Sequence, residues 1–264
     1  MTLVMGIVNV TPDSFSDGGR YLDPDVAVAH ARSLRAQGAD LLDVGGESTR
    51  PGAERVAPRV EQQRVLPVVA ALASEGVFVS IDTMNASTAV AAVDAGARLV
   101  NDVSGGLADP DMLAAVADVH VDIVLGHWRG PSSEMYARAD YSDVGREVAA
   151  ELRERVAAAV AAGIDPSRIV VDPGIGFGKR GAQNWETLRA LPSIGASGYR
   201  TLVGTSRKRF LAETLGDEDA DLTRRDLATA VTSALAARAG AWAVRVHDVP
   251  TTRDALAVAR AWGA

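Results

Sequence analysis

The chain has 264 residues, a formal net charge of −7 and no cysteine. An acidic chain without basic runs does not suit a nucleic-acid surface or an anionic membrane, and the lack of cysteine excludes disulfides and thiolate chemistry. Hydrophobic residues make up 47% of the chain, which is enough for a sizeable core. Because the N-terminus leads directly into an apolar strand pattern and no apolar run approaches the ~18 residues of a spanning helix, we expect a soluble cytoplasmic protein.

Eight short apolar runs, in chain order, have the length and composition of β-strands. They cover residues 4–8, 41–44, 78–81, 99–101, 123–125, 169–171, 201–203 and 243–246. Helical patterns lie between them, the clearest over residues 144–162. Strands that alternate with helices indicate a parallel sheet with right-handed crossover connections.

Turn residues mark the ends of the predicted helices. A glycine that supplies a left-handed C-cap follows five of them: Gly38, Gly76, Gly96, Gly163 and Gly240. Helix starts are predicted at Asp23-Pro24, Asp109-Pro110 and Asp165-Pro166, although the last pair is equally consistent with a turn before a strand.

The number of these strand–helix units decides the predicted architecture. Eight units in about 250 residues favour a closed (β/α)8 TIM barrel, of class α/β, over an open doubly wound sheet. No linker or low-complexity tract divides the chain. We therefore predict a single domain over residues 1–264.

Polar side chains follow nearly every predicted strand. They are Asn9 and then Asp13 in a polar loop; Asp43, Glu47, Ser48, Thr49 and Arg50; Asp82; Asn101 and Asp102; His127 and Arg129; Asp172; Ser206, Arg207 and Lys208; and Arg245 and His247. The carboxyl ends of barrel strands meet at one mouth, so these groups predict an active site there. Asp43 and Asp102 taken singly are more typical of helix N-caps.

The chemistry of these groups suggests two kinds of ligand. Four cationic or titratable side chains suit an anion: Arg50, Lys208, Arg245 and His247. A turn at residues 204–206 before a helix expected over residues 207–215 would present backbone N–H groups to a carboxylate or phosphate.

The second kind of ligand is a flat heterocycle. Asp82, Asn101 and Asp172 supply acceptors for ring N–H groups, and Phe177 either stacks on such a ring or only anchors its glycine-rich loop. Neither the dinucleotide fingerprint nor the phosphate-binding GxxxxGK[ST] loop is present.

Seven sequence blocks, in this order, are similar to those of the dihydropteroate synthase family. They are GIVNVTPDSFSDGG, DVGGESTRPGA, VSIDTM, LVNDVSGG, DPGIGFGK, GTSRKRF and RVHDV. The chain length resembles that of the bacterial, monofunctional members. The resemblance implies that 4-aminobenzoate displaces diphosphate from (7,8-dihydropterin-6-yl)methyl diphosphate to give 7,8-dihydropteroate, with Mg²⁺ as cofactor, sulfonamides as inhibitors and a homodimer as the assembly.

The resemblance also implies a role for individual residues. The pterin would be bound by Asp82, Asn101, Asp172, Phe177, Gly204 and Lys208. The diphosphate would be bound by Asn9, Arg245 and His247, with Asn9 also close to the metal. The 4-aminobenzoate pocket and its closing loops would use Phe15, Ser48, Thr49, Pro51 and Ser206. The catalytic set would be Asp13, Arg50, Lys208, Arg245 and His247.

Two positions depart from the family pattern, and three other functions stay open at this point. Trp128 replaces the methionine that many members carry after the histidine of the fifth strand, and Arg209 follows Lys208 where some members have serine. The alternatives are a class I aldolase that uses Lys208 as a Schiff base, a pterin-binding methyltransferase, and a pterin-binding paralogue without synthase activity.

Overall fold

Eight parallel strands form a closed barrel, as the sequence predicts. In this computed structural model, which describes residues 1–11, 24–48, 55–131 and 136–263, neighbouring strands pair in chain order and β8 pairs with β1. The strands are β1 Leu3–Asn9, β2 Leu41–Gly45, β3 Val79–Asp82, β4 Leu99–Asp102, β5 Asp122–Gly126, β6 Ile169–Asp172, β7 Arg200–Val203 and β8 Ala243–Val246. Each of the eight predicted strands is confirmed, with ends within about one residue.

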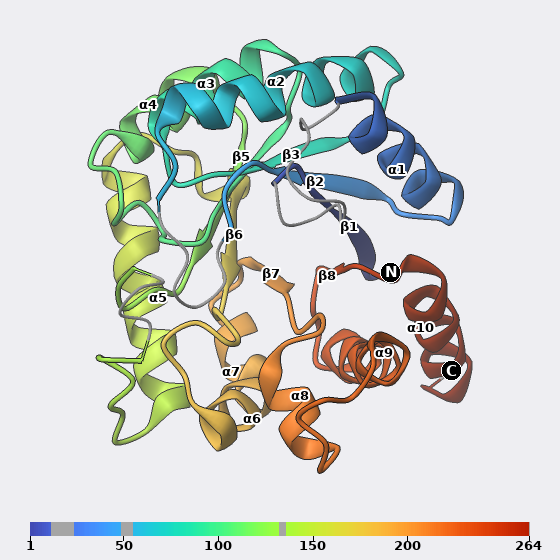
Figure 1. Cartoon of the computed structure of the whole chain (residues 1–264). Coiled ribbons are helices and arrows are strands. Elements are labelled where there is room, and N and C mark those ends of the chain that lie inside the picture. The colour runs from blue at the N-terminus through green and yellow to red at the C-terminus, as the bar shows by residue number, and fades with distance from the viewer. Residues whose placement is uncertain (12–23, 49–54, 132–135, 264) are drawn as a thin grey trace.

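Helices surround the barrel on its outer side (Figure 1). They are α1 Pro24–Ala36, α2 Pro58–Ser74, α3 Ala86–Asp94, α4 Met112–Val119, α5 Val144–Ala161, α6 Gly181–Arg189, α7 Leu191–Gly195, α8 Arg209–Thr214, α9 Leu222–Arg238 and α10 Val249–Gly263. The five predicted C-cap glycines all have positive φ, between +75° and +108°. In the part of the chain that the structure describes, no helix has the length and apolar character needed to cross a membrane.

Two predicted helix starts are wrong. α4 begins at Met112, because the carboxylate of Asp109 instead accepts the N–H groups of Asp111 and Ala86 and holds a turn before the helix. α8 covers only Arg209–Thr214, and Arg207 lies outside it with φ +57°. Asp165 caps a single 3-10 turn, Pro166–Arg168, immediately before β6, which confirms the turn alternative.

The pleat of the strands sorts side chains into two layers. Seven apolar residues, one from each of seven strands, pack inside the barrel: Met5, Leu41, Leu99, Val124, Val170, Leu202 and Ala243. Because strand residues two apart share a face, the next inward positions toward the carboxyl ends include Asp43, Asn101, Asp172 and Arg245. The alternate, outward residues pack against the helices. A polar layer therefore lies on an apolar plug within the barrel.

Candidate active site

Arg245 joins three strands by its side-chain contacts. Its Nε donates to Asp43 Oδ2 at 2.5 Å and its Nη2 donates to Asp82 Oδ2 at 2.6 Å. Asn101 Nδ2 donates to the same Asp43 oxygen at 2.9 Å. β8, β2, β3 and β4 thus contribute to one network. Asp43 is fully buried and Arg245 is only 20% exposed, so the ion pairs are largely shielded from water.

This network corrects the helix N-cap interpretation of Asp43. The residue lies in the middle of β2, and its carboxylate points into the barrel toward Arg245. The other oxygen, Oδ1, has no hydrogen-bond partner among the described residues. Asp102 faces outward and accepts hydrogen bonds from the N–H of Ser104, the hydroxyl of Ser104 and the N–H of Gly106, so it stabilises the loop after β4.

Burial shifts the ionisation of the groups in the barrel mouth. It raises the pKa of Asp82 to about 7, and it raises that of Asp172 although Lys208 opposes this. It also lowers the pKa of Lys208 to about 8. For Arg245 burial lowers the pKa, but Asp43 and Asp82 more than reverse the effect. Shifted pKa values of opposite sense within one mouth are typical of a functional site.

A glycine-rich loop after β6 forms one wall of the mouth. Asp172 Oδ1 accepts the N–H of Gly174 at 2.7 Å, which fixes the start of the loop. Lys208 donates to the carbonyl of Ile175, and its Nζ lies 4.5 Å from the centroid of the Phe177 ring. The ammonium group and the aromatic face are therefore adjacent, an arrangement that can hold a polar, planar ligand.

The turn after β7 positions a histidine. Ser206 Oγ accepts the N–H of His247 at 3.1 Å and lies 2.8 Å from its Nδ1. On the other side of the turn, Arg207 makes a bidentate ion pair with Asp226 of α9, with two contacts of 2.7 Å. α9 therefore fixes the backbone from which Ser206 and Lys208 project.

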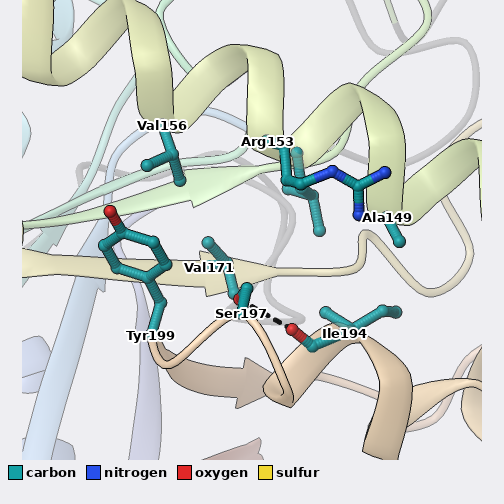
Figure 2. A pocket seen from close by; sticks show the side chains of 8 residues that line it. Ala149, Arg153, Val156, Val171, Ile194, Ser197 and Tyr199 are labelled. Carbon is teal, nitrogen blue, oxygen red and sulfur yellow. Dashed lines mark hydrogen bonds between the residues drawn. The ribbon is translucent and has the colours of Figure 1, made fainter.

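A small cavity elsewhere in the molecule does not belong to this mouth. Its volume is about 20 Å³, and Figure 2 shows it between α5 and the segment around α7, with Arg153, Val171, Ser197 and Tyr199 among its lining residues. Space of this size holds about one water molecule. It lies among outward-facing side chains between the sheet and the helices, outside the barrel mouth.

Comparisons with known proteins identify the family. The family model described as pterin binding enzyme matches residues 5–247. The dihydropteroate synthase of Mycobacterium leprae is 56% identical over 263 residues, which cover 98% of this chain and 93% of that protein. The chain belongs to the dihydropteroate synthase family.

Solved structures of the family superpose closely on this fold. Xanthomonas albilineans dihydropteroate synthase with 4-aminobenzoic acid has a TM-score of 0.92 at 46% identity, covering 100% of this chain and 93% of that one. The same enzyme in complex with 7,8-dihydropteroate has a TM-score of 0.88 at 44% identity, with coverages of 100% and 94%. The Yersinia pestis enzyme in a sulfonamide drug complex has a TM-score of 0.93 at 38% identity, with coverages of 99% and 94%.

The residues expected from the family pattern divide into those brought together and those outside the described residues. The barrel mouth holds Asn9, Asp82, Asn101, Asp172, Phe177, Gly204, Ser206, Lys208, Arg245 and His247, with Ser48 shortly after β2. Asp13, Phe15, Thr49, Arg50 and Pro51 lie outside the described residues. One expectation needs refinement, because Arg245, predicted as an anion-binding group, already neutralises two carboxylates.

Sequence reasoning missed several buried polar residues that support the mouth. Glu61 of α2 is fully buried, and burial raises its pKa. Its Oε2 accepts Asn85 Nδ2 at 2.7 Å, and Asn85 Oδ1 accepts Arg55 Nη2 at 2.7 Å. Arg55 also pairs with Glu47 at 2.9 Å. A charged residue at a helix position that the apolar pattern buries is the signal that would have found Glu61.

Proposed function

We propose that the protein is a dihydropteroate synthase that condenses (7,8-dihydropterin-6-yl)methyl diphosphate with 4-aminobenzoate. The amine nitrogen forms a bond to the pterin methylene carbon, the carbon–oxygen bond to diphosphate breaks, and the amine loses one proton. The observation that carries the proposal is the inward layer of Asp82, Asn101 and Asp172 beside Lys208, in a chain that is 56% identical to a dihydropteroate synthase.

Three groups of this layer, Asp172, Asn101 and Lys208, each have a matching group on a pterin. The ring N–H and amino groups of the pterin can donate hydrogen bonds to the side-chain oxygens of Asp172 and Asn101. The ring carbonyl can accept a hydrogen bond from the Lys208 ammonium group. The Phe177 ring supplies an aromatic face next to that ammonium group. A buried site with these groups would reject ligands that leave them unpaired.

The other substrate groups would occupy the outer part of the mouth. Asn9, Arg245 and His247 would bind the diphosphate, and Ser206 would lie near the carboxylate of 4-aminobenzoate. The Ser206–His247 hydrogen bond supports this arrangement, since it holds the imidazole at the rim. Asp13, Arg50, Phe15, Thr49 and Pro51 are proposed to close over the substrates.

An Mg²⁺ ion fits the donor chemistry at the end of β1. Mg²⁺ is usually held by one or two protein oxygens, several waters and the phosphates of a substrate. The amide oxygen of Asn9 would be one such protein ligand, and the diphosphate would supply others. When bound, the ion would add positive charge that stabilises diphosphate as it leaves.

The chemical step needs no strong general base, because a neutral arylamine is already a nucleophile. Its barrier lies in breaking the bond to diphosphate, which Arg245 and His247 would assist by stabilising negative charge. We further propose that this bond breaks before the new one forms, with the Asp13 carboxylate near the cationic methylene. Diphosphate should then be released slowly when 4-aminobenzoate is omitted, and its complete retention under conditions that allow loop closure would contradict this order of events.

A turnover assay tests the function directly. Purified protein, Mg²⁺, the dihydropterin diphosphate and radiolabelled 4-aminobenzoate should yield dihydropteroate and diphosphate, and a sulfonamide should block both. Binding of pterin without any product would instead identify a paralogue that has kept the pocket and lost the reaction.

We also propose that the protein is a cytoplasmic homodimer. Three exposed apolar residues form a stripe on α9: Leu227, Val231 and Leu235, each between 52% and 59% exposed. They follow one another at intervals of four residues and so share a helix face. A contiguous apolar stripe of this kind is more typical of an interface than of a free surface. Cell fractionation would test the cytoplasmic location.

A further inference from the structure

Lys179 is a buried cation with no role in the proposed chemistry. It follows the glycine-rich loop after β6, and its side chain is only 1% exposed. Within the described residues it has no carboxylate within ion-pair distance. Burying an ammonium group is costly unless hydrogen bonds replace its water, so its contacts require an explanation.

Three acceptors surround the Lys179 ammonium group. Nζ donates to the carbonyl of Gly174 at 2.9 Å and to that of Phe177 at 3.1 Å, and it lies 2.9 Å from Nδ1 of His127. Burial lowers the pKa of Lys179 to about 7, but three acceptors match the three hydrogens of its ammonium form completely and so favour that form.

The tautomer of His127 decides whether its Nδ1 can serve as the third acceptor. Its Nε2 lies 2.9 Å from Glu151 Oε2, a carboxylate that Arg129 also contacts. A carboxylate accepts, so Nε2 carries the hydrogen, and Nδ1 presents its lone pair to Lys179. Burial, followed by the charge of Lys179, lowers the pKa of His127 to about 4, which agrees with a neutral ring.

The segment that Lys179 holds has little conformational preference of its own. Gly174, Gly176 and Gly178 have φ of +64°, +83° and +58°, in the left-handed region, and glycine loses more backbone freedom on ordering than any other residue. Lys179 fixes two carbonyls of this segment, at residues 174 and 177. The same segment carries the Phe177 ring and accepts the Lys208 ammonium group through the carbonyl of Ile175.

We propose that Lys179 is the positioning residue of the pterin pocket: its buried ammonium group, oriented through His127 and Glu151, fixes loop 174–178 so that Phe177 and Lys208 face the pterin ring. This inference rests on the proposed function. Lys179 itself does not touch the substrate, so its effect is confined to the ring-binding half of the mouth.

The test compares two ligands in Lys179→Met, which keeps the length of the side chain and removes its donors. Affinity for 6-hydroxymethylpterin, measured by calorimetry, should fall by about tenfold or more, because charge-assisted hydrogen bonds that order the loop are lost. KM for the pterin diphosphate should rise in parallel, whereas KM for 4-aminobenzoate should stay unchanged. An unchanged pterin affinity in the folded variant, or equal losses for both substrates, would overturn the inference.

A second pair of variants keeps the inference testable if Lys179→Met does not fold. In Glu151→Gln the amide oxygen should face Arg129, which only donates, so the amide nitrogen donates to His127 Nε2; this turns a ring hydrogen toward Lys179 and should weaken pterin binding. Glu147→Gln is the matched control on α5, because Glu147 pairs with Arg129 without contacting His127, and it should bind pterin like the wild type. Equal affinity in the two variants would contradict the inference. If the wild type bound no pterin, the proposed function itself would fail.

Discussion

Arg245 has two kinds of anionic partner that compete for its guanidinium group. They are the carboxylates inside the barrel and the diphosphate expected at its mouth. Nε and Nη2 are committed to Asp43 and Asp82, and the third guanidinium nitrogen, Nη1, is not used in those contacts. Arginine suits this double role because its planar group presents five donors in fixed directions. The residue therefore links the stability of the polar layer to substrate binding.

Arg245→Ala should weaken binding of the pterin diphosphate far more than binding of a pterin without diphosphate. It should also lower the free energy of unfolding by about 3–5 kcal/mol, because the buried carboxylate of Asp43 loses its cation. Calorimetry with both ligands and urea unfolding measure the two effects. Equal losses of affinity for the two ligands would move Arg245 out of the anion site.

Lys208 should make pterin affinity depend on pH. Burial lowers its pKa to about 8, so the charged donor is present below that pH and is lost as the pH rises through it. Affinity for 6-hydroxymethylpterin should accordingly fall between about pH 7 and pH 9. Lys208→Ala should bind weakly at all pH values and lack this decline. A wild-type affinity that is constant over the range, or wild-type kinetics in the variant, would exclude the assigned role.

At the level of elements, the loop after β6 and the turn before α8 are packed together as one unit. A Cβ atom on Gly176 would lie 2.7 Å from Cδ of Lys208, although the two residues come from successive strand–helix units. Asn184 of α6 accepts the N–H of Gly176 at 2.6 Å and so holds the loop from outside. The width of the proposed pterin pocket would thus depend on a close approach between two elements.

Gly176→Ala should displace Lys208 and reduce pterin affinity by about tenfold, since the added methyl group occupies the space of the lysine side chain. Gly198→Ala is the control, because Gly198 has a similar φ of +86° but a Cβ atom added there would meet no described atom within 4 Å. Both variants should lose about 1 kcal/mol of unfolding free energy from the left-handed backbone. Equal pterin affinities would show that the close approach does not matter.

At the scale of the whole molecule, the two faces of α9 have different surroundings. Its inner face contacts the turn that carries Ser206 and Lys208, through Asp226 and Thr229. Its outer face carries the exposed apolar stripe. A partner bound to the stripe would therefore lie directly behind a helix that supports the site.

A Leu227→Glu and Val231→Glu double variant should be monomeric, because it places two charges in the stripe. Sedimentation velocity measures the change in mass. Val26→Glu on α1 is the control, since Val26 is a single exposed valine at 46% exposure, outside the stripe, and this variant should stay dimeric. A wild type that sediments as a monomer would contradict the proposed homodimer.

Much of this architecture is encoded locally in the sequence. Apolar runs and C-cap glycines mark where each strand and helix begins and ends, since backbone preferences act over a few residues. The polar strand ends also follow from local pattern, because the pleat sends alternate residues to the same face and parallel strands end at one mouth. Asp82, Asn101, Asp172 and Arg245 could be assigned to one site for this reason.

Other features were decided only when the barrel closed. Asp43 and Arg245 are 202 residues apart, and their contact depends on the register of β8 against β1 and of β1 against β2. Lys179 gives no sign in the sequence that it is buried, because its three acceptors come from a strand end and a loop that only the tertiary structure brings around it. Local sequence sets which groups reach the mouth. Long-range packing sets which of them are paired, and with that their charge and their chemistry.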